Sequence, residues 1–155
     1  TYNRSSFLKE TIESVLAQDD GAIEYLILDD GSTDETRAII EPYRPCLSYH
    51  YHDNVGETIT VNRGISIAKG EWIAIVNSDD PLLPGWLFTM RTAIAENPKA
   101  KLFYPDWLRI DAKGHILAVV KQPDYSIFKM IPCQTCYNFN CNIGPGMLIH
   151  RDLYK

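Results

Sequence analysis

The feature that most constrains the fold is a short apolar run that ends abruptly in two acids. Residues 25–28 (Tyr-Leu-Ile-Leu) have the length and composition of a buried parallel strand. Asp29 and Asp30 follow directly, and Ser32 and Glu35 then have the S-x-x-E spacing of a capping box, which predicts a helix start. Strand, acidic turn and helix in this order begin a βαβ unit, so the sequence predicts an α/β fold.

Asp29 and Asp30 are the first candidate site residues. In open α/β sheets, ligands bind just beyond the carboxyl ends of the strands, which is where these two acids stand. Carboxylates accept hydrogen bonds from ribose hydroxyls and base N–H groups, and they also bind cations. A solvated Asp-Gly turn between a strand and a helix has the same residues, so this motif alone leaves both interpretations open.

A second buried strand is expected to end in a second acidic turn. Residues 72–76 are the most strongly apolar run in the chain, and residues 77–81 (Asn-Ser-Asp-Asp-Pro) follow it. Asp79 and Asp80 can hold Mg²⁺ or Mn²⁺ through hard oxygen ligands, with a diphosphate completing the octahedron, although Asp before Pro is also a favourable turn. Acidic ends of parallel strands converge on one sheet edge, where like charges cost energy unless a cation or ligand uses them. The repetition therefore favours a ligand site.

The remaining elements are predicted from apolar periodicity and from glycine and proline at their ends. The expected helices cover residues 5–17, 34–41, 57–69, 86–96 and, as a short helix, 124–130; the expected strands cover residues 47–51, 102–104, 107–110, 115–120 and 146–149. Asp106 follows the strand at 102–104, so we expect it at the same edge of the sheet as the two acidic turns.

The helix predicted for residues 5–17 carries a complete apolar stripe that must pack on another element. No strand precedes this helix in the sequence, so we expect the chain to begin at the end of a strand that belongs to a longer protein. Tyr2 would then lie at the carboxyl end of that strand, close to Asp30. A disordered terminus is the alternative for Tyr2.

The composition excludes some classes of partner. With 155 residues, of which 45% are hydrophobic, the chain suits one globular domain. The formal net charge of −5 argues against a nucleic-acid partner, because phosphate binding requires a basic patch. No apolar run approaches the roughly 20 residues of a membrane span. We expect a cytoplasmic location, and a peripheral association with the cytoplasmic face of a membrane stays open.

Three of the four cysteines lie close together near the end of the chain. Cys133, Cys136 and Cys141 form a C-x-x-C-x-x-x-x-C pattern, with His150 further on, which could be a zinc site. The spacing fits no common structural zinc pattern well, and the neighbouring aromatic residues are typical of packing. Free, partly buried thiols in a reducing compartment are therefore the alternative.

Four motifs occur in the order and spacing of glycosyltransferase family 2, which the sequence resembles over nearly its whole length. They are Thr1-Tyr2-Asn3, Asp29-Asp30-Gly31-Ser32-Thr33-Asp34, Asn62-Arg63-Gly64 with Lys69-Gly70-Glu71, and Asn77-Ser78-Asp79-Asp80. The resemblance implies an inverting transferase of the GT-A fold, which is a Rossmann-like three-layer α/β/α arrangement with a mostly parallel central sheet. It also implies a nucleotide-diphospho-sugar donor, with UDP as the expected nucleotide, and a role in cell-surface polysaccharide biosynthesis.

The resemblance also implies a role for each candidate residue. Tyr2 would stack on the nucleobase, and Asp30 would bond the base, typically uracil, with Asp29 beside it. Asp79 would hold the ribose or assist the metal, and Asp80 would coordinate Mn²⁺ or Mg²⁺ that bridges the diphosphate. Aromatic stacking on a base is worth roughly 1–3 kcal/mol. The metal would neutralise the charge that develops on the leaving diphosphate.

Three departures from the family pattern matter. Asn77 stands where many relatives have an acid, so the metal site has one fewer charge. The first strand is absent before Thr1, and the acidic motif that contains the catalytic base is expected beyond Lys155. We therefore expect residues 1–155 to be one nucleotide-sugar-binding domain, incomplete at both ends and inactive alone. Asp106 is a candidate sugar contact, with a capped strand end as the alternative.

Two other functions fit parts of the pattern. A response-regulator receiver domain also has paired acids after a strand, but it requires its acceptor Asp where Asn77 stands, and it gives no role to residues 62–64. A non-catalytic nucleotide-sugar-binding module fits all of the motifs. The sugar and the acceptor, whether saccharide, lipid or protein, stay open.

Overall fold

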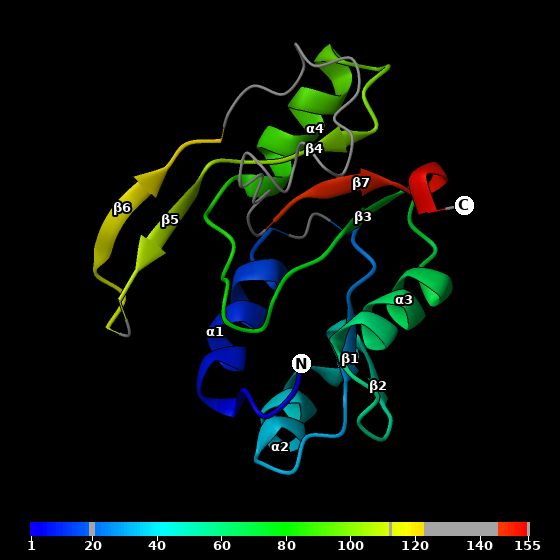
Figure 1. Cartoon of the computed structure of the whole chain (residues 1–155), viewed down its shortest axis with the longest axis vertical. Helices are drawn as coiled ribbons and strands as arrows, with labels where there is room; N and C mark the ends of the chain where they lie inside the picture. The colour runs from blue at the N-terminus through cyan, green and yellow to red at the C-terminus, as the bar shows by residue number, and fades with distance from the viewer. Residues whose placement is uncertain (19–20, 112, 123–145, 155) are drawn as a thin grey trace.

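A computed structural model describes residues 1–18, 21–111, 113–122 and 146–154 of the chain (Figure 1). The helix expected at residues 124–130 and the three clustered cysteines, Cys133, Cys136 and Cys141, lie outside the described residues. The described elements alternate helices with short strands, which confirms the predicted α/β class. Across the described ranges, no helix combines the length and the apolar character that a membrane span requires.

The elements follow one another in the order that the sequence predicts. The α-helices are α1 (Ser5–Leu16), α2 (Thr36–Ile40), α3 (Glu57–Ile67) and α4 (Trp86–Glu96), and 3₁₀ helices cover Glu41–Cys46 and Arg151–Tyr154. The strands are β1 (Leu26–Asp29), β2 (Ser48–Tyr51), β3 (Trp72–Ala74), β4 (Leu102–Phe103), β5 (Trp107–Ile110), β6 (Ile116–Val120) and β7 (Leu148–His150).

The strands form three sheets in the described part of the chain. β1 and β2 pair in parallel, with Leu26 opposite Ser48 and Asp29 opposite Tyr51. β7 lies between β3 and β4 and is antiparallel to both, so β3 and β4 run in the same direction as each other. β5 and β6 form an antiparallel hairpin, which extends away from the other elements in Figure 1. A mostly parallel sheet was the expectation, and β7 is the strand that departs from it.

The predicted capping box between Ser32 and Glu35 is wrong. The Ser32 Oγ atom accepts a hydrogen bond from the Asn3 backbone N–H at 3.0 Å, so it does not cap the helix. The Asp34 Oδ1 atom instead accepts a hydrogen bond from the Thr36 N–H at 3.0 Å, and α2 begins at Thr36. A tertiary contact thus replaces the local motif.

The apolar stripe of α1 packs where the sequence places it. Leu8 and Ile12 are buried in one cluster with Ile27 of β1 and Ile40 of α2. On the other side of β1, α3 approaches closely at Gly64, where an added Cβ would lie 3.1 Å from the Leu28 Cδ1 atom. β1 is therefore covered by helices on both faces, as expected for a buried strand of an α/β sheet.

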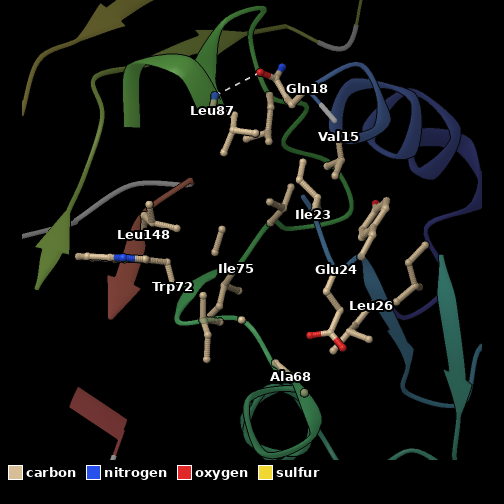
Figure 2. Close-up of a pocket in the computed structure, with 18 of the residues that line it drawn as sticks. Val15, Gln18, Ile23, Glu24, Leu26, Ala68, Trp72, Ile75, Leu87 and Leu148 are labelled. Atoms are coloured by element: carbon tan, nitrogen blue, oxygen red, sulfur yellow. Dashed lines mark hydrogen bonds between the residues drawn. The ribbon is translucent and has the colours of Figure 1, made fainter. Parts of the chain in front are cut away.

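A cavity of about 460 Å³ lies between β1 and β3. Mainly apolar side chains line it, among them Val15, Leu26, Ile75 and Leu148 (Figure 2). At its edge the Thr1 amino group donates to the Leu28 carbonyl at 2.6 Å, and the Asp30 N–H donates to the Thr1 carbonyl at 2.9 Å.

These two bonds have the pattern of a parallel ladder, formed by Thr1 on the side of β1 that faces away from β2. The strand that the sequence leads us to expect before Thr1 stays a prediction.

Candidate functional site

The pairing of Thr1 with β1 brings Tyr2 to the first acidic turn. The Asp30 N–H donates to the Thr1 carbonyl, so Tyr2 follows the ladder directly at the carboxyl end of β1. The residue is 49% exposed, which leaves the ring available to a ligand. The predicted proximity of Tyr2 to Asp30 is therefore present in the structure.

Asn3 fastens this first segment to the acidic turn. Its backbone has a left-handed φ of 49°, and its Oδ1 atom accepts hydrogen bonds from the N–H groups of Thr33 at 2.8 Å and Asp34 at 3.3 Å. The Asn3 N–H donates to Ser32 Oγ in return. Asn is one of the few residues that adopt this conformation readily, so its presence in the first motif has a structural reason.

Asp29 is buried and holds the turn from inside. Only 1% of the residue is exposed; Oδ1 accepts from the Ser32 N–H at 2.8 Å, and Oδ2 accepts from the Tyr49 hydroxyl at 2.6 Å. Burial and this hydrogen bond to Asp29 raise the pKa of Tyr49. Asp29 therefore ties β2 to the turn, a contact that the sequence analysis missed.

Asp30 is also buried, and both of its carboxylate oxygens accept backbone hydrogen bonds. Oδ1 accepts from the Val55 N–H at 2.7 Å and Oδ2 from the Gly56 N–H at 3.0 Å, just before α3 begins. The residue is 5% exposed, and the His52 Nδ1 atom lies 3.5 Å from Oδ1. Burial alone would raise the pKa of Asp30, but the hydrogen bonds from Val55, Thr60 and Gly56 and the nearby His52 outweigh it, so the pKa lies below its ordinary value.

Asp30 therefore combines a structural role with a free acceptor capacity. An ionised carboxylate has about four lone-pair sites on its two oxygens. The hydrogen bonds from the Val55 and Gly56 N–H groups and from the Thr60 side chain use three of these sites. A base N–H can occupy a remaining site, and the lowered pKa keeps the group in the accepting form at neutral pH.

The second acidic turn follows β3, and an ion pair links it to residues 1–4. The Arg4 Nε atom lies 3.7 Å from the Asp79 Oδ2 atom, and both side chains are about half exposed. The Asn77 Nδ2 group donates to the Asp80 Oδ2 atom at 2.7 Å. Asn77 therefore orients Asp80. Arg4 links residues 1–4, which pair with the first acidic turn, to the second acidic turn.

The hydrogen bond of the Asp106 side chain is to the β5–β6 hairpin and not to either acidic turn. The Asp106 Oδ1 atom accepts from the Gln122 N–H at 2.8 Å and so closes the base of the β5–β6 hairpin. This is the contact that the capped-strand alternative predicts. The side chain is exposed, and a role in sugar binding stays a prediction.

The candidate metal site consists of two adjacent carboxylates. In the part of the chain that the structure describes, no group of three or more His, Cys, Asp or Glu side chains lies close enough to hold an ion. Asp79 and Asp80 would supply hard oxygen ligands, and an ion there would require further oxygens from a substrate or from water. Mg²⁺ is commonly bound in this way, through one or two carboxylates and substrate phosphates.

Comparison with known proteins decides the family. A family model described as "Glycosyl transferase family 2" matches residues 1–155. The chain belongs to glycosyltransferase family 2. This membership sets aside the receiver-domain alternative, and it confirms the resemblance that the four motifs carry.

Two bacterial glycosyltransferases illustrate the extent of the likeness. The chain is 33% identical over 124 residues to the glycosyltransferase RT0329 of Rickettsia typhi, which covers 79% of this chain and 39% of that protein. It is 34% identical over 99 residues to the glycosyltransferase GlyG of Streptococcus pneumoniae, which covers 61% of this chain and 33% of that protein. The chain thus spans between a third and two fifths of these relatives.

Solved structures of glycosyltransferases share the fold. TarS of Staphylococcus aureus, crystallised as residues 1–349 with UDP-GlcNAc, matches with a TM-score of 0.72 and 24% identity over 99% of this chain and 44% of that chain. Glucosyl-3-phosphoglycerate synthase of Mycobacterium tuberculosis, crystallised with Mn²⁺, UDP and glucosyl-3-phosphoglycerate, matches with a TM-score of 0.65 and 14% identity over 99% of this chain and 55% of that chain. These likenesses confirm the GT-A fold that the sequence predicts.

Proposed function

We propose that residues 1–155 form a nucleotide-sugar-binding domain that takes a UDP-linked donor, and that the protein transfers the sugar to an acceptor with inversion in a metal-dependent reaction. The observation that carries this proposal is that residues 1–4 contact both acidic turns. The Thr1 ladder joins Tyr2 to the turn after β1, and the Arg4–Asp79 pair joins the same segment to the turn after β3. β1 and β3 belong to separate sheets in the described part of the chain, and residues 1–4 bridge the turns that follow them, so base, ribose and diphosphate contacts can lie close together.

Tyr2 and Asp30 are proposed to bind the base. The half-exposed ring of Tyr2 offers a stacking face, and Asp30 offers carboxylate lone pairs for a uracil N–H. Asp29 stabilises the turn that carries Asp30, because it accepts hydrogen bonds from Ser32 in the turn and from Tyr49 in β2. The solved relative TarS was crystallised with UDP-GlcNAc, which supports a uridine donor for this chain.

Asp79 and Asp80 are proposed to hold Mn²⁺ or Mg²⁺, and Asp79 also to contact the ribose. Both side chains are hard oxygen donors, and Asn77 orients Asp80 without adding charge. The bound ion would neutralise charge on the leaving diphosphate. The mycobacterial relative was crystallised with Mn²⁺ and UDP, which supports a divalent ion here.

Binding without transfer is the second candidate function for these residues. Each carboxylate of the described later segments already has a structural partner. Asp106 accepts from the Gln122 N–H, Asp111 accepts from the Lys113 and His115 N–H groups, and Asp152 pairs with Lys101. We therefore assign no catalytic base here, and we keep the proposal that it follows Lys155. The acceptor stays open. A cytoplasmic location, peripheral membrane contact and a role in polysaccharide biosynthesis stay predictions.

Hydrolysis of the donor distinguishes transfer from mere binding. We would incubate the full-length protein with UDP-[¹³C]glucose, UDP-[¹³C]GlcNAc or UDP-[¹³C]galactose and Mn²⁺, and follow the anomeric signals by NMR. An inverting enzyme releases the β-anomer first from an α-linked donor, by slow transfer to water. Binding of UDP without release of any sugar would support the non-catalytic module, and first release of the α-anomer would contradict inversion.

A further inference from the structure

Three polar side chains on one side of α1 contact the loop that carries the second acidic turn. Thr11 and Ser14 lie in α1, and Gln18 lies in the turn that follows it. Their spacing of three and four residues places them on a single helical face. We call Thr11, Ser14 and Gln18 the bracing residues. None of them belongs to the motifs that mark the family in this sequence.

Thr11 and Ser14 hold the loop on either side of the two acids. The Thr11 hydroxyl donates to the Ser78 carbonyl at 2.9 Å, and the Leu82 N–H donates to the Ser14 Oγ atom at 2.9 Å. The Ser14 hydroxyl itself donates to the Thr11 carbonyl at 2.8 Å. Ser78 and Leu82 bracket residues 79–81, so the two contacts fix both ends of the acidic segment.

Gln18 holds the continuation of the loop into α4. Its Nε2 group donates to the Leu83 carbonyl at 2.9 Å, and its Oε1 atom accepts from the Leu87 N–H at 3.2 Å, a bond that Figure 2 shows beside the cavity. Leu87 lies in the first turn of α4, where backbone N–H groups have no partner within the helix. Gln18 therefore satisfies a helix end and fixes the loop with the same side chain.

The loop depends on these contacts because it has no regular structure of its own. Residues 75–85 form neither strand nor helix. The backbone hydrogen bonds found for these residues are short-range: Asp80 N–H to the Asn77 carbonyl, Trp86 N–H to the Leu83 carbonyl and Thr89 N–H to the Gly85 carbonyl. Thr11 is 2% exposed, so its bond to Ser78 is protected from water.

We propose that the bracing residues are positioning residues, which hold Asp79 and Asp80 in place before the metal and the diphosphate arrive. The proposal rests on the proposed function, because it assigns the purpose of the bracing to that site. Ligands held in advance lose less freedom on binding, so a braced pair of carboxylates binds an ion more tightly than a mobile pair. A purely structural role would stabilise the fold without changing the affinity of the folded protein for the ion.

The test compares Thr11→Val with Thr11→Ser in the full-length protein. Valine has the shape of threonine but no hydroxyl, whereas serine keeps the donor. Thr92→Val is the control for loss of a threonine hydroxyl, because the Thr92 hydroxyl donates to the Phe88 carbonyl within α4 at 3.0 Å. Free Mn²⁺ is measured by electron paramagnetic resonance during titration in the presence of UDP, and uridine affinity is measured by calorimetry with EDTA.

We expect Thr11→Val to weaken Mn²⁺ binding about fivefold, the equivalent of one lost hydrogen bond. Uridine affinity should change less than about twofold, which is within the usual effect of a remote substitution. Thr11→Ser and Thr92→Val should bind Mn²⁺ as the unaltered protein does. Unchanged Mn²⁺ affinity in Thr11→Val, or a serine variant as weak as the valine variant, would overturn the proposal.

Hydrogen exchange of the loop separates a failure of this inference from a failure of the proposed function. We expect peptides that cover residues 78–83 to exchange several-fold faster in Thr11→Val than in Thr11→Ser, with no ligand added. Equal exchange would show that the hydroxyl does not hold the loop and would overturn the bracing. If the unaltered protein bound neither UDP nor Mn²⁺, the proposed function would fail, and with it the purpose that we assign to the bracing.

Discussion

Asp30→Asn should both destabilise the protein and weaken uridine binding. The carboxylate accepts backbone hydrogen bonds within the fold and is proposed to accept another from the base. In the folded protein its oxygens accept from Val55 N–H at 2.7 Å and Gly56 N–H at 3.0 Å. Hydrogen bonds to a charged group contribute about 1.5–3 kcal/mol each. Asparagine keeps one neutral acceptor and turns an NH₂ group toward the other donor, so we expect a loss of roughly 2–4 kcal/mol in the free energy of unfolding.

The pH dependence of this loss identifies the charge as its cause. The pKa of Asp30 is lower in the folded protein than its ordinary value, so the native state binds fewer protons than the unfolded state. The stabilisation from Asp30 is then complete above the unfolded pKa of about 3.9 and is lost as the pH falls through the folded pKa. The difference between the unaltered protein and Asp30→Asn should therefore stay constant from pH 7 to about pH 5 and shrink as the pH is lowered further through the folded pKa.

Urea denaturation of the full-length protein across this pH range measures the difference. Asp53→Asn is the matched control, because Asp53 is an exposed carboxylate in the neighbouring loop, and it should change the unfolding free energy by less than about 0.5 kcal/mol. Uridine affinity of folded Asp30→Asn should fall about tenfold, as for the loss of one charged hydrogen bond. A stability loss below about 0.5 kcal/mol at pH 7, or one that does not vary with pH, would refute this account of Asp30.

Three further predictions follow from other contacts. Tyr2→Ala should lower uridine affinity by about tenfold, as for the loss of one stacking contact, while leaving the melting temperature nearly unchanged because the ring is half exposed; calorimetry and thermal unfolding check both. Asn77→Asp should destabilise the metal-free protein, because it removes the donor to Asp80 and adds a like charge, and Mn²⁺ should restore the melting temperature. Gly31→Ala should cost more than about 2 kcal/mol in urea denaturation, because Gly31 has a φ of +82° and the new Cβ would lie 2.7 Å from the Asn54 backbone nitrogen.

Local sequence patterns predicted the elements that position the site. The apolar run before Asp29 forms β1, and the stripe with Leu8 and Ile12 is buried against it. Such patterns are reliable here because burial on one face imposes a period that the residues display. The same patterns predicted that each acidic turn follows a buried strand, and the turns do follow β1 and β3.

Contacts between distant residues were beyond this reasoning. The capping-box spacing of Ser32 is a local signal, and Asn3, which is remote in sequence, uses the Ser32 hydroxyl instead. The burial of Asp29 depends on Tyr49, and no pattern within either segment indicates the pair. The apolar run at β7 predicted a strand, but its direction between β3 and β4 cannot be seen in a pattern that is the same in both directions.

The most direct test of the central claim is calorimetry of the full-length protein with UDP, in Mn²⁺ and then in EDTA. Two acidic turns bridged by residues 1–4 predict that UDP binds more tightly with Mn²⁺, that Asp80→Asn removes most of this gain, and that uridine without phosphate binds equally well in both solutions. UDP binding that is the same in Mn²⁺ and EDTA would contradict a metal site at Asp79 and Asp80. No binding of UDP in either solution would contradict the proposed donor.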